Sequence, residues 1–144
     1  MTQLHATAIS LAGAGILIRG PSGCGKSDLA LRLIDEEAIL IADDRVDINL
    51  VDGKLQLSAP PTIQGLFEMR GIGVVDIGTI QNIPLKLIVD LRPGSEIERM
   101  PEIKSELIDG FDIPVFVIDP FELSALAKIK MALRIQVGEV TLIE

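Results

Sequence analysis

Residues 14–27 read AGILIRGPSGCGKS, and this stretch decides the fold. Its last eight residues, Gly20–Ser27, match the pattern G-x-x-x-x-G-K-S of a phosphate-binding P-loop. The apolar run Ile16–Ile18 before the motif predicts a buried strand, and the apolar spacing after it predicts a helix over about 25–36. A glycine-rich turn alone does not explain a Lys-Ser pair between a strand and a helix. The stretch therefore predicts nucleotide or phosphate binding.

The residue types of the motif suit the binding of an anion. Glycines let the backbone fold around a phosphate, and the N-terminus of the following helix offers free N–H groups. We expect Lys26 to reach the β- and γ-phosphates and the Ser27 hydroxyl to hold Mg²⁺. The expected phosphate-binding residues are Gly20, Pro21, Ser22, Gly23, Cys24, Gly25, Lys26 and Ser27.

Length and composition narrow the class of protein. The 144 residues predict a single domain, 1–144, and a content of 48% hydrophobic but only 3% aromatic residues predicts an aliphatic core. A net charge of −8 argues against a nucleic-acid partner. No apolar run approaches the roughly 20 residues that span a bilayer, and no basic leader opens the chain, so we expect no membrane partner and a cytoplasmic location. The single cysteine, Cys24, excludes an intrachain disulfide and a cysteine-based zinc site.

A second polar feature follows the helix. The continuous apolar run Ala38–Ala42 predicts a strand buried on both faces, and it ends abruptly in Asp43 and Asp44. Carboxylates at the end of such a strand, one element after a P-loop, are well placed to organise Mg²⁺ or to activate a hydroxyl. A polar turn into the next strand is the structural alternative.

The other elements are predicted from local patterns. Asp52-Gly53 between two alternating runs predicts a tight hairpin. Strands are expected over 4–10, 15–19, 46–51, 54–58, 84–91 and 113–118, with a strand-like tail over 135–144. Helical structure is expected as a turn within 62–67, a short helix near 102–107, and an amphipathic helix capped by Asp119 that runs from Pro120 to residue 133.

Two further candidates stay open on the residues alone. The segment Glu68–Asp76, a predicted loop, places Gly71 and Gly73 beside Glu68 and Arg70. It fits a second anion or metal site, or an ordinary loop held by an ion pair. His5, the only histidine, is by its position near the terminus more typical of a surface residue than of a catalytic one.

Three motifs in order, Gly20–Ser27, Ile41–Asp47 and Glu68–Asp76, resemble those of HPr kinase/phosphorylase. The similarity is to a short form of that family that corresponds to its C-terminal catalytic domain, and it covers residues 4–91 well. It implies an α/β fold: a P-loop kinase core resembling phosphoenolpyruvate carboxykinase, with a mixed sheet and flanking helices, usually assembled as a homo-hexamer.

The resemblance also implies a reaction and its residues. Family members use ATP and Mg²⁺ to phosphorylate a serine of HPr, a phosphocarrier of the phosphotransferase system, and remove that phosphate by phosphorolysis with inorganic phosphate, forming pyrophosphate. By position, Ser27 and Glu68 would hold Mg²⁺. Asp43 would be the catalytic carboxylate with Asp44 supporting it, His5 and Lys26 complete the implied catalytic residues, and the implied supporting loop residues are Arg70, Gly71 and Gly73.

His5 matches the histidine that precedes the P-loop strand in the family. We expect it beside Asp43, where it would help set the protonation state of that carboxylate and make the balance of the two reactions sensitive to pH.

One segment departs from the family. Where its members typically have Gly-Arg-Asn before the last helix, this sequence has Asp119-Pro120-Phe121-Glu122 and no arginine. Two alternatives therefore stay open: a small-molecule P-loop kinase, and a nucleotide-binding regulatory subunit with little catalysis. The predicted hairpin and the few arginines argue against the first, and the missing arginine favours the second.

Overall fold

The computed structural model describes residues 2–143 and consists of a curled mixed sheet with two helices. The helices are α1 (Lys26–Asp35) and α2 (Ala125–Gln136), with 3₁₀ turns η1 (Pro61–Ile63) and η2 (Gly94–Glu96). The strands are β1 (Thr2–His5), β2 (Thr7–Leu11), β3 (Ala14–Arg19), β4 (Ile39–Ala42), β5 (Arg45–Val51), β6 (Lys54–Ser58), β7 (Leu66–Met69), β8 (Gly73–Asp76), β9 (Ile83–Leu91), β10 (Lys104–Ile108) and β11 (Phe111–Ile118). The predicted fold class is confirmed.

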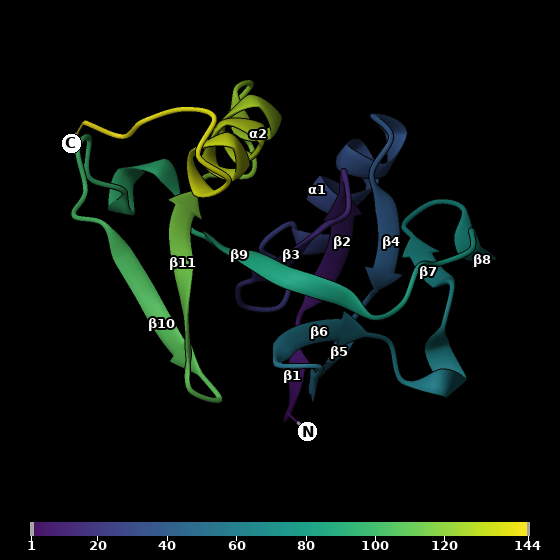
Figure 1. The fold of residues 1–144 in the computed structure, drawn as a ribbon. Coiled ribbons are helices and arrows are strands. Elements are labelled where there is room, and N and C mark those ends of the chain that lie inside the picture. Colours follow the sequence, from purple (N-terminus) through teal and green to yellow (C-terminus); the bar gives the residue numbers. More distant parts are fainter. Residues whose placement is uncertain (1, 144) are drawn as a thin grey trace.

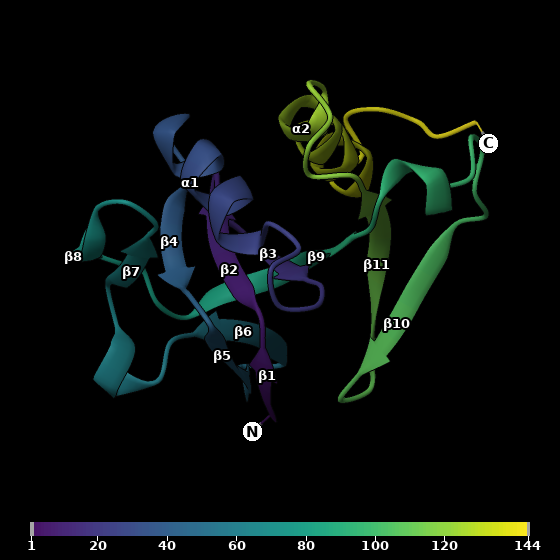
Figure 2. The ribbon, with the colours of Figure 1, turned by 180° about the vertical axis from the view of Figure 1, so that it is seen from behind.

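The central strand is β9, which pairs with three neighbours. It runs parallel to β3 and to β11, and its first residues pair antiparallel with β6. The main path across the sheet is β1-β5-β6-β9-β3-β2-β4, and β10 joins through β11. Figures 1 and 2 show β10 and β11 as a two-stranded arm on the side of the sheet away from β4.

The core has two parts because the side chains of β3 and β9 alternate between the faces of the sheet. Ile16 and Ile18 belong to a cluster with the apolar faces of α1 and α2. Leu17 between them belongs to a second cluster, which the curled β5–β6 hairpin closes with residues such as Leu57. Both clusters are almost entirely aliphatic, as the composition predicts, and together they fix β3 and the loop that follows it.

Several local predictions are confirmed. Helix α1 begins directly after the glycines of the motif, and β4 ends at Ala42. The β2–β3 and β5–β6 pairs are antiparallel, with Val51 opposite Lys54. Asp52 and Gly53 have φ angles of 50° and 75°, the left-handed conformations that a two-residue hairpin turn requires.

The first predicted strand, 4–10, is in fact two strands. The break falls at Ala6, whose backbone N–H donates to the carbonyl oxygen of Asp44 at 3.1 Å. Strand β2 continues in the main sheet beside β3, whereas β1 turns away to pair antiparallel with β5. The alternation of the sequence shows both pieces as extended but does not reveal the change of partner between them.

Two expectations for the second half are wrong, and an earlier one is confirmed in part. Residues 104–108 form β10 and not a helix, because each of them pairs with a residue of β11. The helical turn expected within 62–67 is present as the 3₁₀ turn over 61–63, but it is shorter than expected and β7 begins at Leu66. The tail holds no strand within 135–143, and α2 extends through Gln136.

The start of the last helix is also displaced. Asp119 does not cap it, because its carboxylate accepts hydrogen bonds from the backbone N–H groups of Gly94 at 3.0 Å and Phe121 at 2.9 Å. These bonds hold the segment before α2 as a turn, and the helix begins at Ala125.

One ion cluster ties the arm to the main sheet. Arg19, the last residue of β3, donates to both carboxylate oxygens of Asp90 at 2.8 and 3.0 Å, and to Glu106 at 2.7 Å. These bonds, that to Asp90 above all, outweigh the opposing effect of burial and raise the pKa of the Arg19 guanidinium above its ordinary value. Strands β3, β9 and β10 therefore meet at one side chain, next to the start of the phosphate-binding motif.

We expect Arg19→Met to lower the free energy of unfolding by about 2–3 kcal/mol, because two carboxylates lose a largely buried partner. Arg134→Met is the matched control: its ion pair with Glu139 is exposed, so it should change stability by less than about 1 kcal/mol. Urea denaturation followed by far-UV circular dichroism is the measurement, since the chain contains no Trp or Tyr for fluorescence. Equal effects of the two substitutions would contradict the assigned role of the cluster.

Candidate active site

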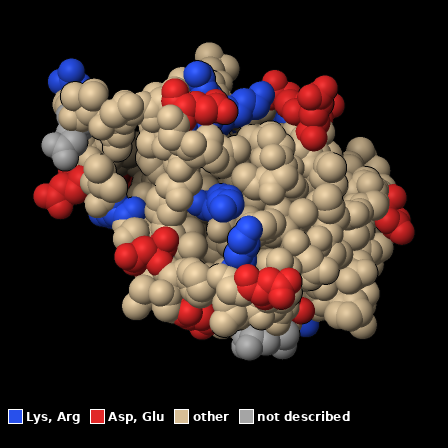
Figure 3. Space-filling view, in the orientation of Figure 1, with Lys and Arg blue, Asp and Glu red and all other residues tan. Residues whose placement is uncertain are grey.

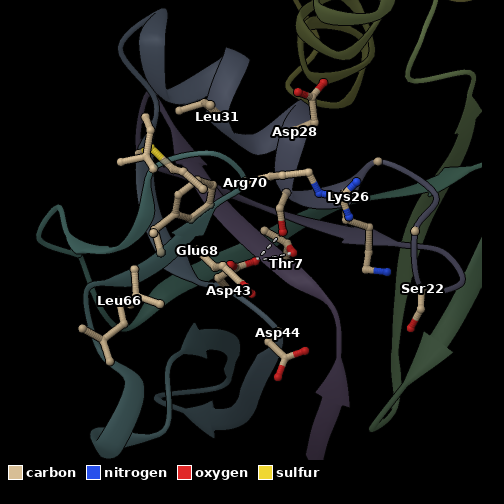
Figure 4. Close-up of a pocket in the computed structure, with 18 of the residues that line it drawn as sticks. Thr7, Ser22, Lys26, Asp28, Leu31, Asp43, Asp44, Leu66, Glu68 and Arg70 are labelled. Atoms are coloured by element: carbon tan, nitrogen blue, oxygen red, sulfur yellow. Dashed lines mark hydrogen bonds between the residues drawn. The ribbon is translucent and has the colours of Figure 1, made fainter.

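A cleft of about 1210 Å³ lies where three separate stretches of the chain meet. Its walls come from the start of α1 with the preceding loop, from the residues after β4, and from the β7–β8 ribbon. Figure 4 shows side chains from all three walls, including Lys26, Asp43 and Glu68, in this one pocket. The fold thus brings together the three motifs that the sequence singles out.

The loop Gly20–Ser27, here called the P-loop, begins at the end of β3 and leads directly into α1. Its last glycine, Gly25, has a φ angle of 102°, a left-handed conformation that L side chains rarely adopt. A Cβ at Gly20 would lie 2.5 Å from the sulfur of Cys24, so a side chain there would displace that sulfur. The backbone conformation therefore favours glycine at position 25, and close packing against Cys24 favours it at position 20.

Lys26 is held at the mouth of the P-loop. Its Nζ donates to the carbonyl oxygen of Gly20 at 2.7 Å and to that of Pro21 at 3.2 Å, and the residue is only 9% exposed. These bonds fold the side chain back over the loop from which it comes. The ammonium group is therefore positioned by the loop's own backbone, beside the free N–H groups of the first turn of α1.

Asp43 connects the end of β4 to the P-loop. Its Oδ1 accepts a hydrogen bond from the Ser27 hydroxyl at 3.0 Å and another from the Thr7 hydroxyl at 3.1 Å. Asp43 thus lies against the residue expected to hold a metal ion. Thr7 was missed by the sequence analysis, since a threonine within a strand carries no signal that distinguishes it from an ordinary β-branched residue.

His5 contacts Asp44 and not Asp43, which corrects the expected arrangement. The distance from His5 Nε2 to Asp44 Oδ1 is 2.7 Å, and both side chains are more than half exposed at the rim of the cleft. Asp44 has a φ angle of 75°, and its carbonyl oxygen receives the N–H of Ala6. The strained backbone turns the two adjacent carboxylates in different directions, Asp43 toward the P-loop and Asp44 toward His5.

The segment 68–76 is a hairpin and not the loop expected from its glycines. Strands β7 and β8 pair antiparallel with Glu68 opposite Val74, and Gly71 and Gly73 have left-handed φ angles at the turn. Glu68 and Arg70 both line the cleft. Among residues 2–143 they form no ion pair with each other, so the ion-pair alternative is wrong.

The oxygen atoms around the cleft suit a hard divalent cation. Ser27, Asp43 and Glu68 supply one hydroxyl and two carboxylates, and Mg²⁺ is commonly bound by one or two carboxylates together with substrate phosphates and water. Within the described residues no three His, Cys, Asp or Glu side chains form a complete metal-binding group. The donors therefore fit an ion that arrives with a phosphate ligand rather than one held by protein alone.

One more residue of the cleft was missed. Phe121, from the segment that departs from the family pattern, lies against the P-loop and lines the cleft although it is 73% exposed. Its approach is close, since a Cβ on Gly25 would be 3.3 Å from the Phe121 ring. No local pattern in the sequence predicts this contact, because it depends on where the turn before α2 returns to the sheet.

The face seen in Figure 3 has no concentration of one charge. Acidic and basic side chains are interspersed there, and much of the area carries neither. None of the helices within residues 2–143 has both the length and the apolar character needed to cross a bilayer.

The structure defines a mixed α/β protein that carries the G-x-x-x-x-G-K-S sequence on a strand–loop–helix unit. More particularly, the chain belongs to the family of the HPr serine kinase C-terminal domain, whose family model matches residues 1–114. The resemblance stated from the sequence motifs is thereby confirmed.

Relatives agree with this assignment. The HPr kinase/phosphorylase of Burkholderia lata is 40% identical over 122 residues, and that of Burkholderia cenocepacia is 39% identical over the same length. These alignments cover 78% of this chain but only 38% of each relative. A solved structure, the Hpr(Ser) kinase/phosphatase from Coxiella burnetii, matches with a TM-score of 0.84 at 23% identity, covering 96% of this chain and 93% of that one. This last likeness concerns the fold.

Proposed function

We propose that this chain transfers the γ-phosphoryl group of ATP to a serine of an HPr-type phosphocarrier protein, and removes that phosphate by phosphorolysis. The observation that carries the proposal is the contact between Asp43 and the Ser27 hydroxyl, 3.0 Å, at the base of the P-loop. It places a carboxylate within reach of the phosphate that such a loop would bind. Family membership and the relatives' names support the choice of substrate.

Phosphoryl transfer depends mainly on positioning and on neutralising charge, and the cleft offers groups for both. The backbone N–H groups at the start of α1 and the Lys26 ammonium would hold the phosphate oxygens and orient the γ-phosphoryl group. Asp43 would accept the seryl proton as the serine oxygen attacks phosphorus. In the reverse direction the protonated Asp43 would return that proton to the serine oxygen as phosphate displaces it.

Mg²⁺ would be held by Ser27 and Glu68, and when bound it would neutralise charge on the phosphate oxygens. Arg70 lies on the same ribbon as Glu68 and lines the cleft, where it would supply a further positive charge. Gly71 and Gly73 shape the turn of that ribbon and thereby position both side chains.

The decisive experiment is transfer of ³²P from ATP to purified HPr of the same organism, with the HPr Ser→Ala variant as the control. Label on wild-type HPr alone supports the proposal. Label on a metabolite instead would support a small-molecule kinase. ATP binding without transfer to either would support a regulatory nucleotide-binding role. Adding inorganic phosphate to labelled HPr and detecting pyrophosphate tests the reverse reaction.

We expect His5→Ala to slow phosphoryl transfer by about two- to tenfold while leaving ATP affinity unchanged. The substitution removes the side chain that holds Asp44, so the rim of the cleft around Asp44 and Arg45 would lose part of its order and transfer would slow. ATP affinity should be spared because the P-loop residue Ser27 bonds to Asp43 and not to Asp44. Single-turnover rates with HPr, alongside calorimetric titration with ATP, are the measurements. An unchanged rate would remove His5 and its contact with Asp44 from the proposed machinery.

Assembly is a further part of the proposal. The family resemblance favours a homo-oligomer, a hexamer in particular, and analytical ultracentrifugation of the purified chain would test it. A monomer at micromolar concentration would contradict this part of the proposal without affecting the assignment of Asp43 and Lys26.

A further inference from the structure

A second hollow adjoins the cleft on the far side of Phe121. It measures about 490 Å³ and lies between the turn before α2, the first half of α2 and the later part of α1. Its apolar wall includes Leu123, Leu126 and Ala127, and Arg32, Glu36 and Lys130 supply charged groups at its edge. Among residues 2–143, Phe121 is the one residue that lines both the cleft and this hollow, here called the α1–α2 groove.

The backbone at Phe121 is held in place while the ring of its side chain is left exposed. The backbone N–H of Phe121 donates to the Asp119 carboxylate, which also receives the N–H of Gly94. The preceding residue is fixed as well, since Arg32 donates to the carbonyl oxygen of Pro120. An aromatic side chain that remains 73% exposed on a segment fixed at three points contributes little to the core. Its accessible ring is instead preorganised to contact another planar group.

From these observations we propose that the α1–α2 groove is the nucleoside subsite of the enzyme and that the ring of Phe121 stacks on the purine base. The inference rests on the proposed binding of nucleotide phosphates at the P-loop. Phe121 contacts Gly25 of that loop, so a base stacked on its ring lies a short distance from phosphates held there. The apolar wall would receive the flat base. The N–H groups of Arg32 that do not bond to Pro120, and the Glu36 carboxylate, which Lys130 approaches at 3.5 Å, offer donors and an acceptor for the polar edge of the base.

If the groove binds the base, the contributions of the base and of the phosphates to the affinity for ATP can be measured separately. Isothermal titration calorimetry should show that Phe121→Ala weakens ATP binding by about 5- to 100-fold, the range typical of a lost base–aromatic stack. Binding of inorganic tripolyphosphate, which lacks a base, should change by less than about twofold. Phe121→Tyr should restore the ATP affinity, because its ring presents the same face. Leu107→Ala, at a comparably exposed apolar residue on β10, is the matched control and should alter neither affinity.

A second variant tests the groove apart from Phe121. Leu126→Arg places a long charged side chain against the apolar wall, and it should weaken ATP binding while sparing tripolyphosphate binding. Equal losses of ATP and tripolyphosphate affinity in Phe121→Ala would overturn the inference, since that residue would then support only the P-loop. Unchanged ATP affinity in Phe121→Ala would overturn it as well.

The observations that would contradict the proposed function differ from those that would contradict the nucleoside subsite. If the unmodified protein bound ATP no more tightly than tripolyphosphate, the groove would not be a nucleoside subsite, while transfer to HPr could still occur. If ATP bound with the expected dependence on Phe121 but no phosphate reached HPr, the subsite would stand and the proposed substrate would be wrong. Binding of neither ligand would overturn both proposals.

Discussion

Replacing Lys26 by alanine is expected to abolish measurable ATP binding and, with it, phosphoryl transfer. The Lys26 ammonium is the cation that the fold holds against the P-loop, through bonds to the carbonyl oxygens of Gly20 and Pro21. Removing a largely buried, hydrogen-bonded charge from a site for phosphates costs about 2–5 kcal/mol, which corresponds to a loss of affinity of about 30-fold or more. Calorimetric titration with ATP and Mg²⁺ is the measurement.

Two companion variants separate loss of charge from loss of structure. Lys26→Met keeps most of the alkyl stem and its packing, so it should lose ATP binding as completely as the alanine variant does. Lys54→Ala removes an exposed lysine at the start of β6 and should bind ATP normally. Far-UV circular dichroism would verify that each variant is folded. Folded Lys26→Met protein that binds ATP with unchanged affinity would rule out the assigned role of the ammonium group.

The P-loop was predictable because its conformation is encoded locally. Eight consecutive residues specify the turn. Because glycine has no side chain, Gly25 can adopt its left-handed conformation and Gly20 can pack closely against its neighbours. The hairpin at Asp52-Gly53 was predictable for the same reason. When the structure of a segment depends mainly on residues adjacent to it in the sequence, that structure can be predicted from the sequence alone.

Other parts of the site depend on partners distant in the chain. Thr7 bonds to a carboxylate 36 positions away, and Phe121 lies against the P-loop on a turn that Asp119 holds through its bond to Gly94 instead of capping a helix. The ribbon 66–76 has the glycines of a loop, yet it pairs with itself as two short strands. These features follow from tertiary contacts, which override local propensity.

The position of Asp44 shows how one such contact changes a functional assignment. The residue types alone do not distinguish the adjacent Asp43 and Asp44, whereas the family resemblance makes Asp43 the catalytic carboxylate with Asp44 supporting it, and the histidine was expected beside Asp43. The left-handed backbone at Asp44 separates the two carboxylates, so that His5 bonds to Asp44 and the two hydroxyls bond to Asp43. We therefore propose proton transfer for Asp43 and shaping of the rim for Asp44, which gives the supporting role expected of Asp44 a definite partner in His5.

This division of roles leads to the second large effect. Asp43→Asn is expected to leave ATP affinity within about threefold of the unmodified protein and to slow transfer to HPr by about 100- to 10,000-fold, the range typical for loss of a general base. Asparagine has nearly the same shape, and its Oδ1 can still accept a hydrogen bond from Ser27 or Thr7, so the P-loop should keep its geometry. The amide cannot accept the seryl proton.

The measurement is single-turnover ³²P transfer to HPr, paired with calorimetric titration with ATP on the same samples. Asp52→Asn is the matched control, because it makes the same chemical change in an exposed hairpin turn where asparagine also tolerates the left-handed conformation.

A further variant, Thr7→Val, removes the hydroxyl that donates to Asp43 while keeping the Asp43 carboxylate, and it should slow transfer by only about two- to tenfold. If Thr7→Val and Asp43→Asn slowed transfer equally, the carboxylate would serve to order the site and not to accept the proton. Full transfer by Asp43→Asn would exclude Asp43 from the chemistry altogether and leave Glu68 as the carboxylate of the cleft to examine next.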